Sequence, residues 1–463
     1  MNIKKGIVYI FIANVINLAV GLFTGFVLPK LLSIETYSDI RLFQLYVTYL
    51  GILHFGFSDG MYLRHGGKNL GNINKDEVLS EFKTFKVFQL AVTVVAVVIS
   101  LILQNKILIF CSLVILPVNV GNYLRNLYQA IGEFKKYSRF TNINTLLFFF
   151  INLILLFIVK SDDPNVYIVM YGVAYFAYWA VLELENRKLF GKRNAMIKRE
   201  YLKSDVKTGF FLMTGNFCNV IFTSVDRLFV QFFMGKIKFA FYSFAVSIEN
   251  LINALVNPIS TVMYNYLCNN REVRKVRLLK RVVLLFGAGI LLFAYPAKFI
   301  IMRWIPNYVE AIPVLFLLFA SQFASIVVRC VHINLYKSNK KQNRYFACMV
   351  VVILISVILN LAFFNIFRTM EVIAVATLIT NIVWLIIGEI DMKKYVLKIR
   401  DYIFVAIILG SFVFTIIIEN AWIGLVVFGA VAIVSSFVCL PEGVGYAFKE
   451  VKRVLHKRQK VGE

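Results

Sequence analysis

Long apolar stretches are the feature that most limits how this chain can fold. Fourteen of them alternate with short polar loops along 463 residues. About 20 apolar residues suffice for an α-helix to cross a hydrocarbon core roughly 30 Å thick. Only 16% of the residues are charged, whereas about a quarter are charged in soluble domains. The sequence therefore predicts an all-α polytopic membrane protein with about 14 transmembrane helices.

The first six expected spans cover Ile7–Leu28, Ile40–Gly60, Phe85–Leu103, Ile107–Ala130, Phe140–Val159 and Val166–Phe190. The next six cover Thr208–Met234, Phe239–Leu267, Arg281–Met302, Ala311–Leu335, Tyr345–Phe367 and Val372–Ile390. The last two cover Tyr402–Ile418 and Trp422–Leu440.

The basic residues fall on alternate loops. The N-terminal stub, the even-numbered loops and the C-terminal tail hold 38 of the 50 Lys and Arg. Basic residues near helix ends are retained on the cytoplasmic side, so we expect both termini inside and a location in the cytoplasmic (inner) membrane. The first apolar run is longer than a signal-peptide core and lacks a cleavage site before Pro29, which predicts a retained helix. The net charge of +25 is scattered over loops that face lipid headgroups, which argues against nucleic-acid binding.

The chemistry-bearing residue types give no sign of a cofactor or a metal. The six cysteines lie in or beside apolar runs without CxxC spacing, so we expect small buried hydrophobic residues rather than a disulfide framework or metal ligands. His54 and His332 have no partner at ligand spacing and are expected to be structural. No cofactor is expected.

Two halves of the chain carry similar polar patterns at an offset of about 200 residues. In the first expected helix, a polar stripe recurs at spacings of three, four and three, which places it on one face. The same spacing recurs in the seventh helix, and a shorter stripe in the second helix recurs in the eighth. The stripes are Asn14, Asn17, Gly21 and Thr24; Asn216, Asn219, Thr223 and Asp226; Gln44 and Thr48; and Glu249 and Asn253.

The repeat predicts two pseudo-equivalent six-helix lobes around a central cavity, because repeated bundles that rock about a cleft are common in transporters. The expected boundaries are 1–190 for the first lobe, 191–207 for a basic cytoplasmic linker, 208–391 for the second lobe, 392–440 for two additional helices and 441–463 for a basic cytoplasmic tail.

Few charged side chains remain inside the expected spans. A charge at mid-membrane costs about 2.5 to 3.5 kcal/mol on insertion scales, so such residues normally face protein or water and are functional candidates. The basic ones are Arg41, Arg125, Arg227 and Arg329, and the acids are Asp59, Asp226 and Glu249.

The surroundings of these charges leave several roles open. Arg329 shares a helical face with Gln322, Ser325 and His332, which predicts a polar stripe inside the second lobe. Arg227 is expected to pair with Glu249 or with a substrate phosphate. For Arg125, snorkelling to the headgroups is an alternative. For Arg41, the alternative is an interfacial ion pair with Asp39.

Three stretches resemble the polysaccharide or O-antigen flippase branch of the multidrug/oligosaccharidyl-lipid/polysaccharide (MOP) exporter superfamily. They are GFSDGMYLRHG from Gly56, SVDRLFVQFFMGKIKFAFYSFA from Ser224, and YQAIGEFKKYSR from Tyr128. The resemblance implies a flippase that moves a polyprenyl-diphosphate-linked oligosaccharide by alternating access, driven by an ion gradient. It also implies a cavity lined by helices one, two, seven and eight, the helices that carry the polar stripes.

On this interpretation, the diphosphate meets cavity arginines, because their rigid fork binds phosphate oxygens in pairs. Arg227 and Arg329 are the first candidates, followed by Arg125 and Arg41. The sugar contacts the polar stripes, with Asn14, Asn17, Asn216, Asn219, Gln44, Thr48 and Asn253 as candidates. Asp226, Glu249 and Asp59 are candidates for coupling to protons or sodium. Lipid-linked sugar, the bilayer, a polysaccharide polymerase and glycosyltransferases are the expected partners, in capsule or lipopolysaccharide biosynthesis.

Two other functions compete with this interpretation. A multidrug exporter of the same superfamily predicts that cavity acids dominate over cavity arginines, whereas the two are nearly balanced here. A membrane enzyme acting on lipid-linked sugar needs a large external loop or a clustered acid and base. The expected outer loops are short, and no GxSxG or HExxH motif occurs in a supporting context. We therefore expect no enzyme activity.

Overall fold

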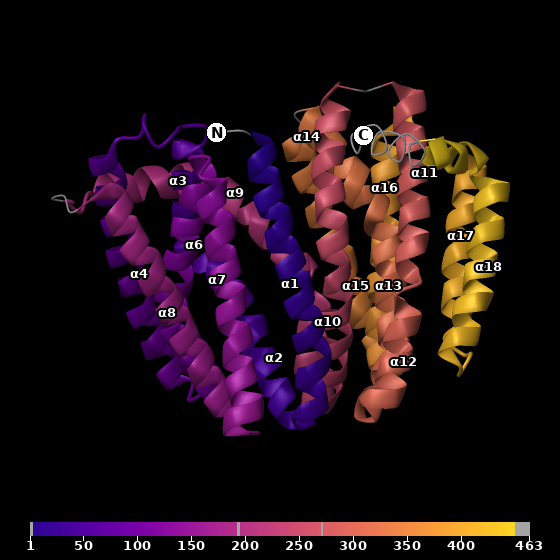
Figure 1. Cartoon of the computed structure of the whole chain (residues 1–463), viewed down its shortest axis with the longest axis horizontal. Coiled ribbons are helices and arrows are strands. Elements are labelled where there is room, and N and C mark those ends of the chain that lie inside the picture. Colours follow the sequence, from indigo (N-terminus) through magenta and orange to yellow (C-terminus); the bar gives the residue numbers. More distant parts are fainter. Residues whose placement is uncertain (1–2, 192–194, 270–271, 340, 450–463) are drawn as a thin grey trace, which may run out of the picture. The chain divides into compact units, whose positions relative to one another are not determined.

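The computed structural model describes residues 3–191, 195–269, 272–339 and 341–449, and the regular elements in that part of the chain are all helices (Figure 1). The chain divides into two compact units, Met1–Ser224 and Val225–Glu463. The repeat-based boundaries instead begin the second lobe at Thr208, and they remain a prediction. Residues 450–463 of the predicted cytoplasmic tail lie outside the described residues.

The first unit is built from α1 (Ile3–Leu31), α2 (Ile34–Tyr49), the 3₁₀ helix η1 (Leu50–His54), α3 (Phe57–His65), α4 (Lys75–Ile102), α5 (Lys106–Leu113), α6 (Ile115–Ala130), α7 (Phe134–Leu153), the π-helix η2 (Ile154–Val159), α8 (Pro164–Phe190) and α9 (Arg199–Phe222). Several begin at strong caps. Asn74 accepts hydrogen bonds from the backbone N–H groups of Asp76 and Glu77 at the start of α4, and Asp163 precedes Pro164 at the start of α8.

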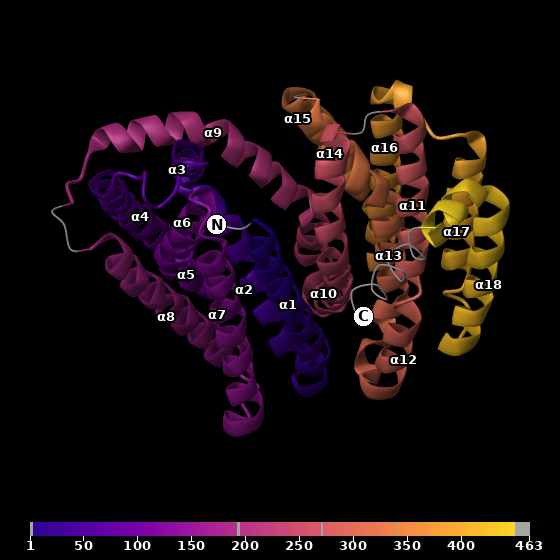
Figure 2. The ribbon, with the colours of Figure 1, turned by 45° about the horizontal axis from the view of Figure 1, so that its top comes forward.

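Helix α9 closes one side of the first unit. Figure 2 shows it passing alongside α3, the short helix that follows the break in the second predicted span. Its first turns also pack on α4. Residues near 60, 80 and 205 are therefore neighbours in space, although they lie far apart in the sequence.

The second unit contains α10 (Val225–Asn269), α11 (Val273–Leu291), α12 (Ala294–Trp304), η3 (Pro306–Ala311), α13 (Ile312–Val327), the π-helix η4 (Val328–His332), α14 (Ile333–Ser338), α15 (Gln342–Phe367), α16 (Met370–Asp391), η5 (Lys393–Tyr395), α17 (Ile399–Phe414) and α18 (Ala421–Cys439). Gly235, with φ 79° and ψ 178°, divides α10 into two helices. A positive φ of this size favours glycine, which has no Cβ to clash with the backbone.

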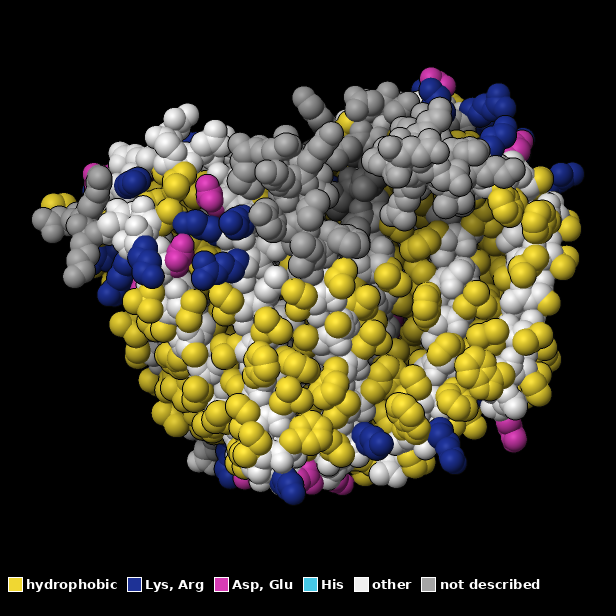
Figure 3. All heavy atoms as spheres, viewed as in Figure 1, with side chains coloured by type: hydrophobic (Ala, Val, Ile, Leu, Met, Phe, Trp, Pro, Cys, Tyr) yellow, Lys and Arg dark blue, Asp and Glu magenta, His cyan; other side chains and the backbone are white. Residues whose placement is uncertain are grey.

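The apolar surface of the helices confirms the membrane class. Ten candidates among the described residues are long and apolar enough to cross a membrane, or up to eleven if the bent pair of α5 and α6 is one span. In Figure 3, hydrophobic side chains cover the visible flanks of the helices, and charged side chains gather toward helix ends. Ile158 is 76% exposed and Phe211 is 82% exposed, as expected for side chains that face lipid. The total of fourteen spans remains a prediction.

Several predicted spans are not continuous helices: Ile107–Ala130 is interrupted at Val114, and Arg281–Met302 is interrupted between Leu291 and Ala294. The span Ile40–Gly60 is broken after His54, where Phe55 and Gly56 both have a positive φ. The span Thr208–Met234 is broken between α9 and α10. Short polar and glycine-containing turns interrupt the helical hydrogen bonds at these last two places, a change that hydrophobicity alone does not reveal.

Aromatic packing fixes the two C-terminal helices to the second unit. Phe412 of α17 stacks on Phe316 of α13, with ring centroids 5.0 Å apart. The Tyr295 hydroxyl of α12 hydrogen-bonds the Thr415 hydroxyl at 2.6 Å. Helices α17 and α18 therefore belong to the second compact unit.

Candidate functional site

A cluster of predicted site residues lies within the second unit. Arg329 of η4 donates hydrogen bonds to Gln322 of α13 and to Asn253 of α10, the latter at 2.6 Å. A longer bond of 3.4 Å reaches Asn257. Gln322 in turn donates to Glu249 of α10. We call Glu249, Asn253, Gln322 and Arg329 the second-unit polar cluster.

The charge of Arg329 is held mainly by neutral groups. The hydrogen-bond partners of its guanidinium in the described part of the chain are amide oxygens, whereas Glu249 is linked to it by hydrogen bonds through Gln322 and acts on its charge from a distance. A guanidinium held by dipoles keeps its positive charge available for an anion. The cluster thus joins a cation and a carboxylate through one amide side chain.

The predicted stripe in α13 is only partly correct. Gln322 and Arg329 are in contact, but His332 turns to Glu389 of α16, with Nε2 3.0 Å from Oε1. The segment Val328–His332 is a π-helix, whose wider turn shifts the residues after it out of the α-helical spacing. Arg329 and His332 therefore face different partners.

Asp226 and Arg227 begin α10. Asp226 is buried, and its carboxylate accepts hydrogen bonds from the Tyr242 hydroxyl at 2.8 Å and from the backbone N–H of Arg227 at 2.7 Å. The guanidinium of Arg227 is half-buried. Asp226 thus acts structurally at the start of this helix, whatever further role it has.

In the first unit, Asp59 joins two predicted features. The Asn216 amide of α9 donates to Asp59 Oδ1 at 3.1 Å, and His54 Nε2 lies 3.5 Å from Oδ2. Gly60 of the GFSDG motif allows α3 and α9 to approach this closely. A Cβ at this position would lie 2.1 Å from the carbonyl oxygen of Asp205 in α9. Such close approach of two helix backbones needs small residues.

The other basic candidates of the first unit bond within their own helices. Arg41 donates to Gln44 at 2.9 Å and lies over the Tyr37 ring. Arg125 donates to Asn122 at 3.0 Å. These contacts leave both alternatives for Arg41 and Arg125 open.

The remaining polar candidates are dispersed. Asn17 of α1 accepts a hydrogen bond from Thr145 of α7, and Asn14 is half-buried on the same helix. Thr48 is exposed and bonds the carbonyl of Leu45 at 2.6 Å. Asn219 is exposed on α9. Within the first unit, no single cluster of described side chains gathers these residues.

The structure also contains two charged clusters that the sequence patterns did not predict. In the second unit, Lys280 of α11 donates to Glu389 of α16 at 2.6 Å, and both are buried. Glu389 also accepts from the backbone N–H of Leu397 at 3.0 Å and from the Tyr402 hydroxyl at 3.2 Å. The sequence offers one signal for this site: Glu389 and Lys280 are an acid and a base that lie near the ends of two predicted helices.

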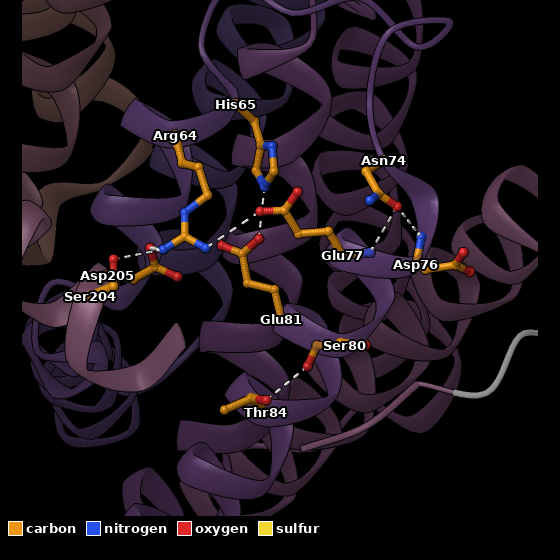
Figure 4. A network of polar contacts seen from close by, with 10 residues as sticks. All are labelled: Arg64, His65, Asn74, Asp76, Glu77, Ser80, Glu81, Thr84, Ser204 and Asp205. Carbon is orange, nitrogen blue, oxygen red and sulfur yellow. Dashed lines mark hydrogen bonds and ion pairs between the residues drawn. The ribbon is translucent and has the colours of Figure 1, made fainter. Parts of the chain in front are cut away.

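In the first unit, charged residues of α3, α4 and α9 meet (Figure 4). Arg64 donates to Ser204 at 2.9 Å and to Asp205, while His65 Nε2 lies 2.7 Å from Glu81 Oε2. Burial and the nearby Glu81 raise the pKa of Asp205 to about 8. Burial lowers the pKa of His65 to about 4, so its ring is neutral at pH 7 and shares a hydrogen bond with Glu81. We call Arg64, His65, Glu81 and Asp205 the first-unit charged cluster.

Neither cluster forms a metal centre. Among the described residues, no group of three or more His, Cys, Asp and Glu could hold a metal ion. All six cysteines are free. Cys111, Cys330 and Cys439 are buried as expected, whereas Cys218 and Cys348 are half-buried and Cys268 is exposed near the end of α10.

Comparison with known proteins supports the fold. The chain is similar to the lipid II flippase MurJ in an inward closed conformation, with a TM-score of 0.70, 15% identity and coverage of 93% of this chain and 98% of MurJ. It is also similar to an outward-facing multidrug resistance MATE transporter of the MOP superfamily, with a TM-score of 0.52, 16% identity and coverage of 84% and 96%. A third similar structure is a MOP superfamily transporter from Pyrococcus furiosus, with a TM-score of 0.52, 14% identity and coverage of 84% of this chain and 96% of that transporter.

These similarities define the fold class. The chain has the MurJ- and MATE-like transporter fold, built of membrane-spanning helices. No protein-family model and no curated protein matches it by sequence.

Proposed function

We propose that this protein is a flippase that moves a polyprenyl-diphosphate-linked oligosaccharide across the cytoplasmic membrane by alternating access. The observation that carries this proposal is Arg329, a half-buried guanidinium held by amide oxygens within the second-unit polar cluster. A diphosphate can displace such neutral partners and take up the fork of N–H donors. The higher TM-score with a flippase, 0.70 against 0.52, supports the lipid-linked substrate.

The remaining predicted residues have roles on this proposal. Arg227, Arg125 and Arg41 provide further positive charge, and the asparagines and hydroxyls of α1, α2, α9 and α10 contact the sugar. Both termini lie in the cytoplasm, and a polymerase and glycosyltransferases act on the same lipid-linked sugar. No chemical bond changes in the transported molecule.

Glu249 is the preferred candidate for ion coupling. Its carboxylate contacts Gln322, which contacts Arg329. A proton or sodium ion bound at Glu249 changes the field at Arg329 and therefore its affinity for the diphosphate. Asp226 and Asp59 are alternatives, although both already hold partners within their own units.

The test is flipping of lipid-linked oligosaccharide by purified protein in proteoliposomes, followed by accessibility of the sugar to an external lectin. Arg329→Gln should lower the initial rate at least about tenfold, since it removes a charge-assisted contact. Arg329→Lys should retain part of the rate. Arg303→Gln is the matched control, because Arg303 is exposed at the end of α12. Unchanged flipping by Arg329→Gln would refute the phosphate role.

A second candidate function is export of organic cations, supported by the MATE similarity and by the buried acid Asp226. It predicts that Asp226→Asn abolishes efflux of a cationic dye, whereas Arg329→Gln preserves it. The same proteoliposomes loaded with dye distinguish the two functions.

A further inference from the structure

Two acids of the first-unit charged cluster face one another. Glu81 comes from α4 and Asp205 from α9, and both side chains are fully buried. Because Glu81 contacts His65 and Asp205 contacts the preceding residue, Arg64, the two carboxyl groups meet in one buried cluster, close enough to interact. Figure 4 shows them converging with Arg64 and His65. Two adjacent ionised carboxylates repel strongly in a buried site.

The hydrogen bonds of the two acids are incomplete. Glu81 Oε2 contacts His65, and Asp205 Oδ1 accepts from Arg64. Glu81 Oε1 and Asp205 Oδ2 are both buried and have no donor among the described protein groups. Buried polar atoms are normally hydrogen-bonded. A single proton between the acids would provide the missing hydrogen bond.

The surrounding charges favour one negative charge rather than two. Arg64 is the cation in contact with Asp205, and it also lies 3.7 Å from Glu77. Neutral His65 supplies a hydrogen bond but no charge.

Other elements contribute only weaker fields. Lys68, in the exposed loop after α3, acts on the cluster from a distance. Tyr123 of α6 and Tyr201 of α9 lie within electrostatic reach of the acids. One contacting guanidinium shared with Glu77 cannot compensate two further carboxylates.

We propose that Glu81 and Asp205 form a proton-binding site, in which one proton is shared between the carboxyl groups and Arg64 compensates the remaining charge. The proton holds α9 against α4, and its loss places two like charges across this contact. The site goes beyond the proposed function, since its ligand is a proton and its existence requires no transported substrate.

Infrared spectroscopy of the purified full-length protein tests the site through the C=O stretching band of a protonated carboxyl. Spectra of wild type, Glu81→Gln and Asp205→Asn are compared at about pH 6, below the raised pKa of Asp205. Either amide provides an N–H donor to the remaining carboxylate and so keeps the contact. Glu77→Gln is the control, because this acid of α4 is half-exposed and contacts the same arginine.

A shared proton predicts that each of the two amide variants loses the same band, while Glu77→Gln retains it. Loss in only one variant would assign the proton to a single acid, and loss in neither would show that no proton is bound; both outcomes overturn the proposal. If a variant does not give a monodisperse protein, titration of the wild type decides. A protonated-carboxyl band must then disappear between about pH 6 and about pH 9, and an unchanged spectrum overturns the site.

Discussion

Lys280 and Glu389 form an ion pair of 2.6 Å between α11 and α16, with both side chains buried. His332, the backbone N–H of Leu397 and the hydroxyl of Tyr402 complete the hydrogen bonds of the carboxylate. Because water reaches neither charge, each buried side chain needs the other as its counter-charge.

Removing one member of this pair should destabilise the second unit strongly. Glu389→Ala leaves a buried ammonium without its counter-charge, which costs about 3 to 5 kcal/mol. Chemical denaturation in detergent measures the loss. The double variant Lys280→Met/Glu389→Leu should be more stable than Glu389→Ala, and an equally unstable double variant would contradict the explanation.

Close packing of α3 and α9 can be tested at glycine. Gly60→Ala should reduce stability by several kcal/mol, because its Cβ would lie 2.1 Å from a backbone oxygen of α9. Gly215→Ala is the matched control on α9, with no atom within 4 Å of its Cβ. The control should gain up to about 1 kcal/mol from helix propensity. The thermal unfolding midpoint of each variant measures both effects.

Lys298 should stabilise the end of α17. Its ammonium donates to the carbonyl oxygens of Ile416 at 3.2 Å and Ile418 at 2.6 Å, just after the helix ends at Phe414. Cations favour the negative end of a helix. Lys298→Met should cost about 1 to 3 kcal/mol and increase hydrogen exchange at the α17–α18 turn. Unchanged exchange there would exclude this role.

The first-unit charged cluster predicts a pH dependence with a defined sign. Between about pH 4 and about pH 8, folded Asp205 retains a proton that the unfolded chain has released, so stability falls as pH rises. His65 acts oppositely between about pH 4 and its ordinary pKa near 6.5. Above that value the proton of the Glu81–Asp205 pair dominates, and because the pair shares one proton, the unfolding constant should rise by at most about tenfold per pH unit up to about pH 8.

Equilibrium denaturation across this pH range is the measurement, and Asp205→Asn should flatten the dependence. A slope of the opposite sign in the wild type would show that Asp205 is ionised throughout.

The sequence predicted helices well where hydrophobicity decides them. The runs in α4, α15 and α18 are apolar around most of their circumference, so only helices can bury their backbone groups in lipid. It predicted less well where a helix breaks. Phe55 and Gly56 change the backbone direction within the expected span Ile40–Gly60, whereas the break at Gly235 falls between two expected spans.

The candidate site was predictable only in part. Gln322 and Arg329 could be linked from their spacing, and the structure places them in contact. The contact of Arg329 with Asn253 could not be predicted from spacing, because it joins two helices that are far apart in the sequence. The partner of His332 was also missed, because a π-turn changed its direction.

Composition and apolar spacing by themselves determined that this chain is a helical membrane protein, because a bilayer accepts few other backbone structures. The charge pattern of the loops also predicted an orientation. Only the tertiary structure decided which charges are paired, as for Glu81, Asp205 and Lys280. Burial makes a charge depend on whichever groups the packing brings within a few ångströms, and those groups come from distant parts of the chain.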